Sequence, residues 1–535
     1  MTIASRIFAR LWKLSPRLNR VEVERAAKVE MRDGVHLLTD IFKPVGIQSA
    51  PTVLLRSPYG RGSIVDAFAR VFAERGYVAV LQSVRGTFGS EGSFNPFFQE
   101  RDDGLDTVDW IERQPWYNGK LGLFGVSYLG QVQWAIAAAL GDRVSAISLD
   151  RTTADFVDAI LDGGGFRLED FLTWSSMISM QERSNAVVQA LKRLVFGDPL
   201  ARDYGKLPLR TMDETVIGHR LPYWRDWLGH PDPQDQFWAP IRDRKSLANV
   251  TAPINLSAGW SDLFIGSEFQ DYLALKAAGA TVRMAIDEGT HSGFGSQGER
   301  MRGAFEWFDI HLKGQAANSE DLTRTRVWMN GEKAWRDVKH WPGEDQRLRL
   351  YPSPDLALSD EPSTGEVGFC WSPANPTPSG EGPTLVAKTG RGDTRSLAAR
   401  DDVLSFTGPV LGNTVDILGQ PIARLEISAD APAHDLFVCL CDVRPDGKST
   451  NISDGYMRLP ASEPGARRVV EIALLAAGWR VEKGHRIQLL VAGGAFPRYA
   501  RHLGTTEPSG SATAMRDVNI TVHAGPGTSL HLPVA

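Results

Sequence analysis

Ser127 lies in a sequence that is typical of a nucleophilic turn. The apolar run Leu121–Phe124 is followed by Gly125-Val-Ser-Tyr-Leu-Gly130, and residues 131–140 are helix formers. A serine on a sharp turn between a strand and a helix, with glycines on both sides, is the pattern of a nucleophile elbow. The second glycine comes one residue later than in plain G-x-S-x-G. The pattern therefore predicts a nucleophile at Ser127, and a chance Gly/Ser turn is the alternative.

Two later turns carry the residue types that would complete a catalytic triad. Asp262 comes after the strand-like run 252–257, and His291 comes after the run 281–287. Loops at the carboxyl ends of parallel strands are where an α/β sheet binds its ligands. The chain order Ser127, Asp262, His291 is that of an α/β-hydrolase triad. Singly, a loop Asp is usually a turn former and a loop His a surface residue, but together the three predict a serine hydrolase in which histidine takes the serine proton and aspartate orients the imidazole.

The segments around these residues predict the sheet that must position them. Strand-like runs alternate with helical runs, which indicates a parallel sheet with helices on both faces. Asp33-Gly34 predicts a hairpin before this alternation begins. The predicted strands are 52–56, 76–83, 122–124, 144–149, 252–257 and 281–287, and the predicted helices are 68–75, 103–114, 131–140, 273–278 and 298–312.

The alternation is interrupted once and then ends. Residues 152–245 have a mostly helical, tryptophan-rich pattern, which is how a cap over an active site looks. From residue 326 to residue 535, short strand-like runs separated by Pro, Gly, Ser and Asp predict a β-sandwich or jelly roll. We therefore predict an α/β fold: an α/β-hydrolase domain of residues 28–151 and 246–325, an inserted helical cap, and an all-β jelly-roll C-terminal domain. Gly380–Asp393 is expected to be a long surface loop.

Composition excludes several classes of protein. The formal net charge of -5 over 535 residues, with no basic cluster, argues against a nucleic-acid partner. No run of about eighteen apolar residues is present, so we expect no membrane span. Three cysteines argue against a disulfide scaffold, and Cys439 and Cys441 are expected to pack in a core from one face of a strand. These features predict a cytoplasmic protein.

The first 27 residues are expected to form a helical extension. Its start is apolar at helical spacing but is broken by cationic residues, so it lacks the apolar core of a signal peptide. One expectation is a surface helix that packs Ile7, Leu11 and Leu14 on the body. The other is an interfacial membrane helix with Trp12 at the lipid headgroups, and a homo-oligomer also stays open. The cationic residues are Arg6, Arg10 and Lys13.

The chain resembles the cocaine esterase and X-Pro dipeptidyl-peptidase family, which also includes α-amino acid ester hydrolases and glutaryl acylases. The resemblance spans residues 28–522 and implies an α/β-hydrolase domain, an inserted cap and a C-terminal jelly roll. The motifs that carry it are Ser57-Pro58-Tyr59, Arg85-Gly86, Gly89-Ser90-Glu91-Gly92, Gly125–Gly130, Gly259-Trp-Ser-Asp262, Gly484-His-Arg-Ile487 and Phe496-Pro-Arg498.

The resemblance also implies an oxyanion site. In this family the Tyr of the Ser-Pro-Tyr turn, here Tyr59, donates its hydroxyl to the oxyanion, and the backbone N–H after the nucleophile, here that of Tyr128, is the second donor. Preorganised donors at a developing oxyanion stabilise the transition state by roughly 3–4 kcal/mol each. Gly60 stands where familiar members have an acidic residue after the Tyr, so the exact substrate does not carry over.

The substrate pocket is the least determined part of the site. Trp174 in the cap and Phe264 beside Asp262 are candidates for an apolar acyl or leaving-group pocket, although most such aromatic residues belong to cores. Members of the family that act on α-amino substrates bind the ammonium with clustered acids. Glu169-Asp170 could serve, but adjacent acids on an exposed helix are expected to be solvated. This favours a simple esterase or amidase over a dipeptidyl peptidase.

The sequence thus predicts a serine hydrolase that cleaves small-molecule carboxylic esters, or amides, through an acyl-enzyme. X-Pro dipeptidyl-peptidase, α-amino acid ester hydrolase and amide acylase are alternatives, as is an acyltransferase with the same triad. A binding protein without catalysis is a further alternative, which the intact triad argues against. No cofactor and no metal are expected, because the scattered histidines lack ligand spacing. Those histidines are His219, His230 and His311.

Overall fold

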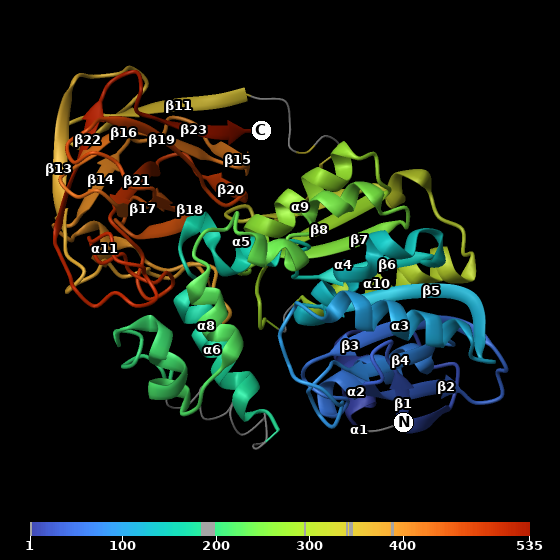
Figure 1. Cartoon of the computed structure of the whole chain (residues 1–535). Helices are drawn as coiled ribbons and strands as arrows, with labels where there is room; N and C mark the ends of the chain where they lie inside the picture. The colour runs from blue at the N-terminus through green and yellow to red at the C-terminus, as the bar shows by residue number, and fades with distance from the viewer. Residues whose placement is uncertain (1–2, 183–197, 294–295, 339–340, 342–345, 387–389) are drawn as a thin grey trace.

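A ten-stranded sheet forms the centre of the first part of the chain (Figure 1). The structure is a computed structural model that describes residues 3–535 except 183–197, 294–295, 339–340, 342–345 and 387–389. The strand order is β1-β2-β4-β3-β5-β6-β7-β8-β9-β10, and the strands from β4 to β9 in this order are parallel. The strands are β1 (Val21–Glu30), β2 (His36–Pro44), β3 (Ala50–Ser57), β4 (Val78–Ser83), β5 (Tyr117–Val126), β6 (Ala146–Asp150), β7 (Ile254–Ser261), β8 (Val282–Thr290), β9 (Thr325–Met329) and β10 (Ala334–Val338).

Helices cover both faces of this sheet, which explains why its central strands are continuous apolar runs. Residues of α3, α4 and α9 join one buried cluster with the strands, and residues of α1, α2 and α10 join another. The predicted alternation of strands and helices and the hairpin about Asp33-Gly34 are confirmed. The helices are α1 (Ile3–Leu11), α2 (Ser63–Ala73), α3 (Glu100–Glu112), α4 (Tyr128–Leu140), α9 (Ile265–Ala277) and α10 (Gln297–Lys313).

The sheet extends beyond the limits expected from the sequence at both ends. Residues 21–27 belong to β1, which pairs antiparallel with β2, so the helical part of the N-terminal extension is α1. Strands β9 and β10 continue the same sheet past residue 325, because β9 pairs with β8 and β10 returns antiparallel to it. The expected start of the β domain at residue 326 therefore lies inside β9.

Helix α1 buries a different face from the one predicted. Trp12, just after the helix, is buried and stacks on Phe8 and Phe68, with ring centroids 4.8 and 5.2 Å apart. Of the three side chains that the sequence predicted to pack on the body, Leu14 packs against this cluster as predicted, but Ile7 and Leu11 are 52% and 66% exposed. The aromatic pair spaced four residues apart removes more apolar area from water than the two aliphatic side chains would.

A helical insertion between β6 and β7 forms the cap, as predicted. Its helices include α5 (Phe156–Ile160), α6 (Leu168–Met180) and α8 (Pro222–Gly229), and the described residues between and after them include short 3-10 turns and one π-helical turn, Asp213–Ile217. Trp224, Trp227 and Trp238 are fully buried in an apolar cluster that the cap shares with the hydrolase domain, so these tryptophans stabilise the cap and its contact with that domain. Among the residues that the structure describes, every helix is too short or too polar to cross a membrane.

The C-terminal part is a sandwich of two antiparallel sheets, which we call the β domain. A nine-stranded sheet and a four-stranded sheet enclose one large apolar cluster, the arrangement expected of a jelly roll. Cys439 and Cys441 are buried free thiols on β17, as predicted. The main strands are β11 (Gln346–Pro352), β13 (Gly365–Trp371), β14 (Val403–Thr407), β15 (Val415–Gly419), β16 (Ile422–Ala429), β17 (His434–Val443), β18 (Ser449–Leu459), β19 (Arg468–Ala473), β20 (Ala477–Val481), β21 (Arg486–Ala492), β22 (Val518–Ala524) and β23 (Ser529–Val534), with the short β12 (Leu358–Ser359) at one edge.

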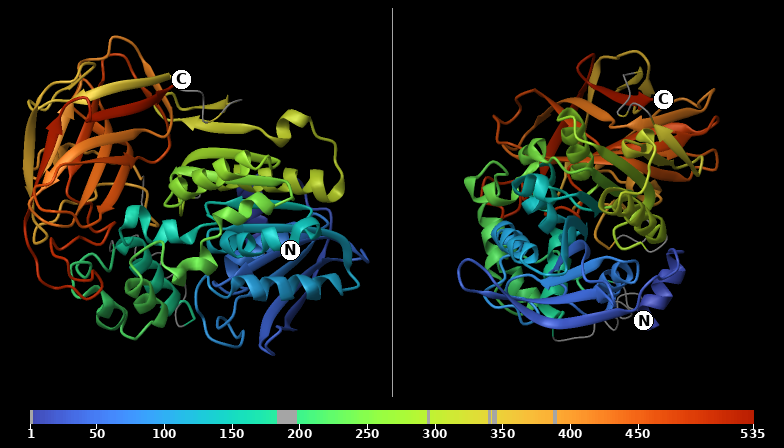
Figure 2. Two further views of the ribbon diagram at one scale, coloured as in Figure 1. Left: turned by 45° about the horizontal axis from the view of Figure 1, so that its top comes forward. Right: turned by 90° about the vertical axis from the view of Figure 1, so that its right-hand side faces the viewer.

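The β domain packs beside both the hydrolase sheet and the cap (Figures 1 and 2). Leu385, in a loop of the β domain, is hydrogen-bonded to Asp170 of the cap and to Ser292, which follows β8. The three parts therefore meet beside the carboxyl ends of β5, β7 and β8, where the predicted triad lies.

Candidate active site

The backbone at Ser127 has the strained geometry of a nucleophile elbow. Ser127 connects β5 to α4 with φ 57° and ψ -126°, a region that non-glycine residues rarely adopt. A Cβ on Gly125 would lie 2.0 Å from the Leu129 carbonyl oxygen, and one on Gly130 would lie 2.5 Å from Thr152 Cγ2. Both glycines are therefore required for close packing around the turn. The turn holds the Ser127 hydroxyl above the carboxyl end of the sheet.

The structure brings Ser127, His291 and Asp262 together in one hydrogen-bonded chain. His291 Nε2 lies 3.0 Å from Ser127 Oγ, and His291 Nδ1 lies 2.6 Å from Asp262 Oδ2. Asp262 is fully buried, and its Oδ1 accepts the backbone N–H of Phe264 at 2.8 Å. A carboxylate can only accept, so Nδ1 carries the imidazole proton and Nε2 is left to accept from Ser127. This arrangement can deprotonate the serine and stabilise the resulting imidazolium.

Two hydrogen-bond donors flank the serine. The Tyr59 hydroxyl accepts a hydrogen bond from Trp174 Nε1 at 3.2 Å and is also in hydrogen-bond contact with Ser127. Burial raises the pKa of Tyr59, so the phenol keeps its proton near neutral pH. Tyr128 is the first residue of α4, so its backbone N–H has no partner within the helix and lies at the positive end of the helix dipole.

Ser127 opens onto a small apolar cavity. The wall is mainly aromatic, and its free volume is about 20 Å³, room for about one water molecule. The structure places Trp174 and Phe264 in this wall, where the sequence predicted a pocket, and the Phe264 ring also meets the His291 ring edge-on at 5.5 Å. The lining residues are Tyr59, Phe97, Ser127, Tyr128, Phe156, Asp170, Phe171, Trp174, Leu263, Phe264 and Leu385.

Asp170 is buried in this wall and not solvated, so that part of the sequence prediction was wrong. Asp170 is 2% exposed, and its Oδ2 accepts from Arg167 Nε at 2.7 Å. Arg167, three residues earlier, is itself buried and neutralises the carboxylate, which makes burial tolerable. The neighbouring Glu169 is half-buried, and burial raises its pKa to about 7. Neither acid presents an unpaired exposed carboxylate of the kind expected from the sequence.

The β domain contributes Leu385, which the sequence did not reveal. The segment Gly380–Asp393 was expected to be a surface loop, yet its described residues 382–384 and 390 are buried. The Leu385 backbone N–H donates to Asp170 Oδ1 at 2.6 Å, and its carbonyl accepts from Ser292 Oγ at 2.9 Å. These two bonds hold the Leu385 side chain in the cavity wall. No local pattern predicts this contact, because it depends on how two domains pack.

Comparisons with known proteins agree with this geometry. Residues 33–293 match the family model "X-Pro dipeptidyl-peptidase (S15 family)", and residues 317–531 match "X-Pro dipeptidyl-peptidase C-terminal non-catalytic domain". The chain is 30% identical over 530 residues to cocaine esterase of Rhodococcus sp. strain MB1 Bresler, which covers 89% of this chain and 92% of that protein.

Two solved structures share the fold along the whole chain. An α-amino acid ester hydrolase has a TM-score of 0.80 at 23% identity and covers 97% of both chains. An aminopeptidase from the marine sediment archaeon Thaumarchaeota archaeon has a TM-score of 0.80 at 23% identity and covers 96% of both chains. The likeness includes the β domain and the cap as well as the sheet.

Proposed function

Because the chain belongs to the cocaine esterase and X-Pro dipeptidyl-peptidase (S15) family of serine hydrolases, we propose that Ser127, His291 and Asp262 are its catalytic triad. The observation that supports this best is the hydrogen-bonded chain of 3.0 and 2.6 Å that ends on the strained Ser127. The proposed reaction is hydrolysis of carboxylic esters through an acyl-enzyme.

The proposed mechanism has two matched halves. His291 Nε2 takes the proton of Ser127 Oγ as Oγ bonds to the carbonyl carbon, and Asp262 stabilises the imidazolium. The tetrahedral intermediate collapses, the bond to the leaving oxygen breaks, and His291 gives that oxygen its proton. Water then attacks the acyl-enzyme with His291 as base again, which releases the acid and restores Ser127.

The proposed oxyanion site consists of the Tyr59 hydroxyl and the Tyr128 backbone N–H. Trp174 supports this role because its indole N–H already occupies an acceptor position of the Tyr59 oxygen. The phenol hydrogen is then left to donate toward Ser127, where the oxyanion develops.

The proposed substrate is an ester with a compact apolar acyl group. The cavity beside Ser127 is small and mostly aromatic, which favours apolar groups of few atoms. Asp170 is the single acidic residue among the described lining residues, and its oxygens are bonded to Arg167 and to the Leu385 N–H. A free α-ammonium would find no unpaired carboxylate there. This is the observation that favours a simple ester over the amino-acid substrates named for some relatives.

Hydrolysis of a p-nitrophenyl ester series, beside the matching p-nitroanilides, tests the proposal. We expect Ser127-dependent turnover of short acyl esters, slow or absent anilide turnover, and no activity in Ser127→Ala. A fluorophosphonate probe should label the wild type and leave Ser127→Ala unlabelled. Aminoacyl-proline anilide turnover would identify a peptidase, and partitioning of the acyl group to an added alcohol would identify an acyltransferase. Ester turnover that survives Ser127→Ala would remove Ser127 from the mechanism.

We also propose that the exposed face of α1 makes a reversible contact with an anionic membrane surface on the cytoplasmic side. Ile7 and Leu11 are exposed on this helix beside the exposed Arg6 and Arg10, which is the composition of an interfacial helix. Trp12 takes no part, because it is buried. The free thiols are consistent with a reducing compartment.

Sedimentation with lipid vesicles tests this contact. We expect binding to phosphatidylserine-containing vesicles at low salt and loss of binding in Ile7→Ser/Leu11→Ser, with neutral phosphatidylcholine vesicles as the control. A concentration-dependent dimer that the same double variant abolishes would instead assign this face to self-association.

A further inference from the structure

Arg151 is a fully buried arginine in direct contact with the triad acid. It follows β6 with φ 47°, a conformation that is uncommon for a non-glycine residue. Its Nε lies 3.7 Å from Asp262 Oδ2, the same oxygen that accepts from His291 Nδ1. One oxygen of the triad aspartate therefore faces the imidazole on one side and a guanidinium on the other. Arg151 does not line the cavity beside Ser127.

Two glycines leave the space that the guanidinium fills. A Cβ on Gly259 would lie 2.8 Å from Arg151 Nη2, and a Cβ on Gly289 would lie 2.6 Å from the same atom. Gly259 lies three residues before Asp262, and Gly289 lies two residues before His291. The guanidinium is thus seated between the two strand ends that carry the base and its acid. The Arg151 backbone N–H also bonds to the Ser257 carbonyl at 2.8 Å, which joins β6 to β7.

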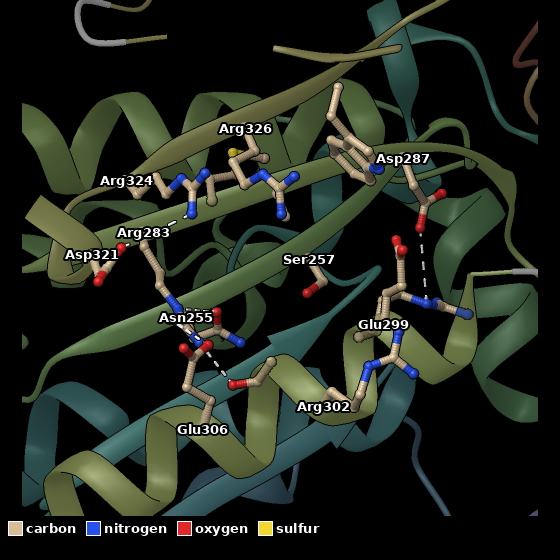
Figure 3. A pocket seen from close by; sticks show the side chains of 15 residues that line it. Asn255, Ser257, Arg283, Asp287, Glu299, Arg302, Glu306, Asp321, Arg324 and Arg326 are labelled. Carbon is tan, nitrogen blue, oxygen red and sulfur yellow. Dashed lines mark hydrogen bonds and ion pairs between the residues drawn. The ribbon is translucent and has the colours of Figure 1, made fainter. Parts of the chain in front are cut away.

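Arg151 belongs to a closed ring of four charged side chains. It contacts Asp287 at 2.6 Å and Asp150 at 3.2 Å, and Arg300 of α10 contacts the same two carboxylates at 3.9 and 2.7 Å. Asp287 and Arg300 also line a cavity of about 280 Å³ between β8 and α10. Figure 3 shows Asp287 at the end of this cavity near Glu299 and Arg302. Solvent reaches the outer half of the ring through this cavity, whereas the inner half touches Asp262.

The charges of this group complement a protonated histidine. When Asp262 is counted with the ring, the group contains two arginines and three aspartates. With all five ionised, its net charge is one negative charge, which complements the imidazolium formed during catalysis. Burial raises the pKa of Asp150 to about 7 and raises that of Asp287, so the count of one negative charge holds only where both carboxyls are ionised, above about pH 7. Glu268 of α9 also faces this group, and burial raises its pKa well above the usual value, which favours its neutral form.

We propose that Arg151 is a positioning residue for the triad: it compensates the charge of the buried Asp262 carboxylate and holds that carboxylate aimed at His291, and it ties the triad acid to the Asp150–Asp287–Arg300 ring. This inference rests on the proposed triad. Without the guanidinium, the one cationic partner left to the buried Asp262 among the described residues would be the His291 imidazolium, which forms transiently. With it, the acid is compensated in the resting enzyme as well.

The test compares the pH dependence of kcat/KM in the full-length wild type, Arg151→Met and Arg151→Lys. Removal of a positive charge near the imidazole raises its pKa, so we expect the acid limb of Arg151→Met to move up by about one pH unit. We expect kcat to fall at least tenfold and KM to change less than twofold, because Arg151 is outside the cavity wall. Arg151→Lys restores the charge and should return the limb most of the way to its wild-type position.

Arg458→Met is the matched control. Arg458 is an arginine of the β domain bound by both oxygens of Asp435, and it is not among the residues that line the cavity beside Ser127. Its loss should lower the melting temperature without moving the acid limb. An unchanged limb in a folded Arg151→Met protein would overturn the inference.

If Arg151→Met does not fold, Arg300→Met provides a second test of the same inference. It opens the same ring at its solvent side, so its limb should move up by a smaller amount. A folded Arg300→Met protein with a wild-type limb would then count against the ring. Absence of Ser127-dependent turnover in the wild type would instead remove the proposed triad itself, so the two failures are distinguishable.

Discussion

The Tyr59 hydroxyl accepts a hydrogen bond from Trp174, and this bond favours an orientation of the phenol in which its own hydrogen is free to donate to another acceptor. The indole N–H of Trp174 donates to the phenol oxygen, and Ser127 interacts with the same hydroxyl in the wall of the same cavity. An oxyanion donor is useful only when it is preorganised, because the rate gain comes from not having to reorient during the reaction. Trp174 therefore has two roles at the residue scale: it lines the cavity, and it orients the tyrosine.

Replacing Tyr59 measures this donor directly. Tyr59→Phe should lower kcat by roughly a hundredfold or more, which corresponds to about 3 kcal/mol of transition-state stabilisation. Trp174→Phe keeps an aromatic wall and removes only the indole N–H, so its loss of kcat should be smaller, about tenfold. Steady-state kinetics on the best p-nitrophenyl ester checks both, with circular dichroism to confirm folding. A Tyr59→Phe enzyme with wild-type kcat would show that the phenol does not bind the oxyanion.

The residues that the sequence could predict are those that follow strands. Ser127, Asp262 and His291 each come directly after a strand-like run, and parallel strands bring their carboxyl ends to one edge. Arg151 also follows a strand, but a single arginine after a strand has no pattern that separates it from a surface residue. Its burial depends on Gly259 and Gly289, which lie more than a hundred residues away.

At the scale of elements, the start of α4 packs closely against the residue pair that follows β6, through a contact between Gly130 and Thr152. Gly130 faces Thr152, which is fully buried, and the Thr152 hydroxyl has no hydrogen-bond partner among the described residues. This contact bears on the proposed catalysis because α4 begins at the residue after Ser127. A displacement of α4 away from Thr152 would also displace the proposed nucleophile, Ser127, and the Tyr128 N–H.

A double-mutant cycle tests the contact between Gly130 and Thr152. Gly130→Ala should destabilise the protein by about 1–3 kcal/mol, since the added Cβ would lie 2.5 Å from Thr152 Cγ2. Thr152→Ala removes that methyl group, so the double variant should recover part of the loss, with a coupling of about 1 kcal/mol. Urea unfolding of the four proteins gives the cycle. Additive losses would mean that α4 moves away from Thr152 instead of clashing with it.

His434 at the start of β17 makes the β domain sensitive to acid. Its side chain is 1% exposed, neither ring nitrogen has a hydrogen-bond partner among the described residues, and burial lowers its pKa to about 4 from 6.5. The unfolded chain therefore binds a proton between these values and the folded chain does not. This contribution to stability is lost as pH falls through 6.5 toward 4.

His434→Leu isolates that contribution. Between pH 7 and pH 5 we expect the wild type to lose about 2 kcal/mol of unfolding free energy more than the variant does. Urea midpoints at several pH values measure the difference between the two proteins, which cancels the opposite contribution of buried carboxyls with raised pKa values. Parallel pH profiles for wild type and variant would show that His434 is solvated or protonated in the folded state.

Strand β18 shows why a strand with polar residues in the core is hard to predict from sequence. Strand β18, Ser449–Leu459, carries serine, asparagine, aspartate and glycine, which are signals of a turn. In the structure Asn451 bonds to Asp454, and Asp454 pairs with the buried Arg498. The long-range partner Arg498 makes the buried Asp454 tolerable inside the sandwich, and hydropathy alone cannot reveal such a pair.

At the scale of the whole molecule, the cavity beside Ser127 is assembled from three parts of the chain. The hydrolase sheet supplies Ser127 and Phe264, the cap supplies Trp174 and Phe171, and the β domain supplies Leu385. The order of the parts could be predicted from changes in pattern along the sequence. Their convergence could not, because the bonds of Leu385 to Asp170 and Ser292 join residues far apart in the chain.

Leu385→Ala should widen the range of acyl groups. The side chain limits a cavity of about 20 Å³, so its truncation should shift the best p-nitrophenyl ester toward longer or bulkier acyl groups. The kcat/KM ratio between butyryl and acetyl esters should rise by about tenfold or more, while Ser127 reactivity toward a small fluorophosphonate stays near the wild-type rate. Leu356→Ala, a partly exposed leucine elsewhere in the β domain, is the matched control. An unchanged acyl preference would place the acyl group elsewhere.

The loop that carries Leu385 allows substrate specificity to change independently of the proposed catalytic residues. The proposed triad of Ser127, His291 and Asp262 follows strands of the hydrolase sheet, whereas Leu385 is presented by a loop of the β domain. Mutations in this segment can therefore change which ester is accepted without endangering the machinery that cleaves it. A library of variants confined to residues 380–386 would therefore sample new substrate specificities while leaving the proposed triad unchanged. Homologues that diverged in the same segment would keep the triad and differ in the esters they accept.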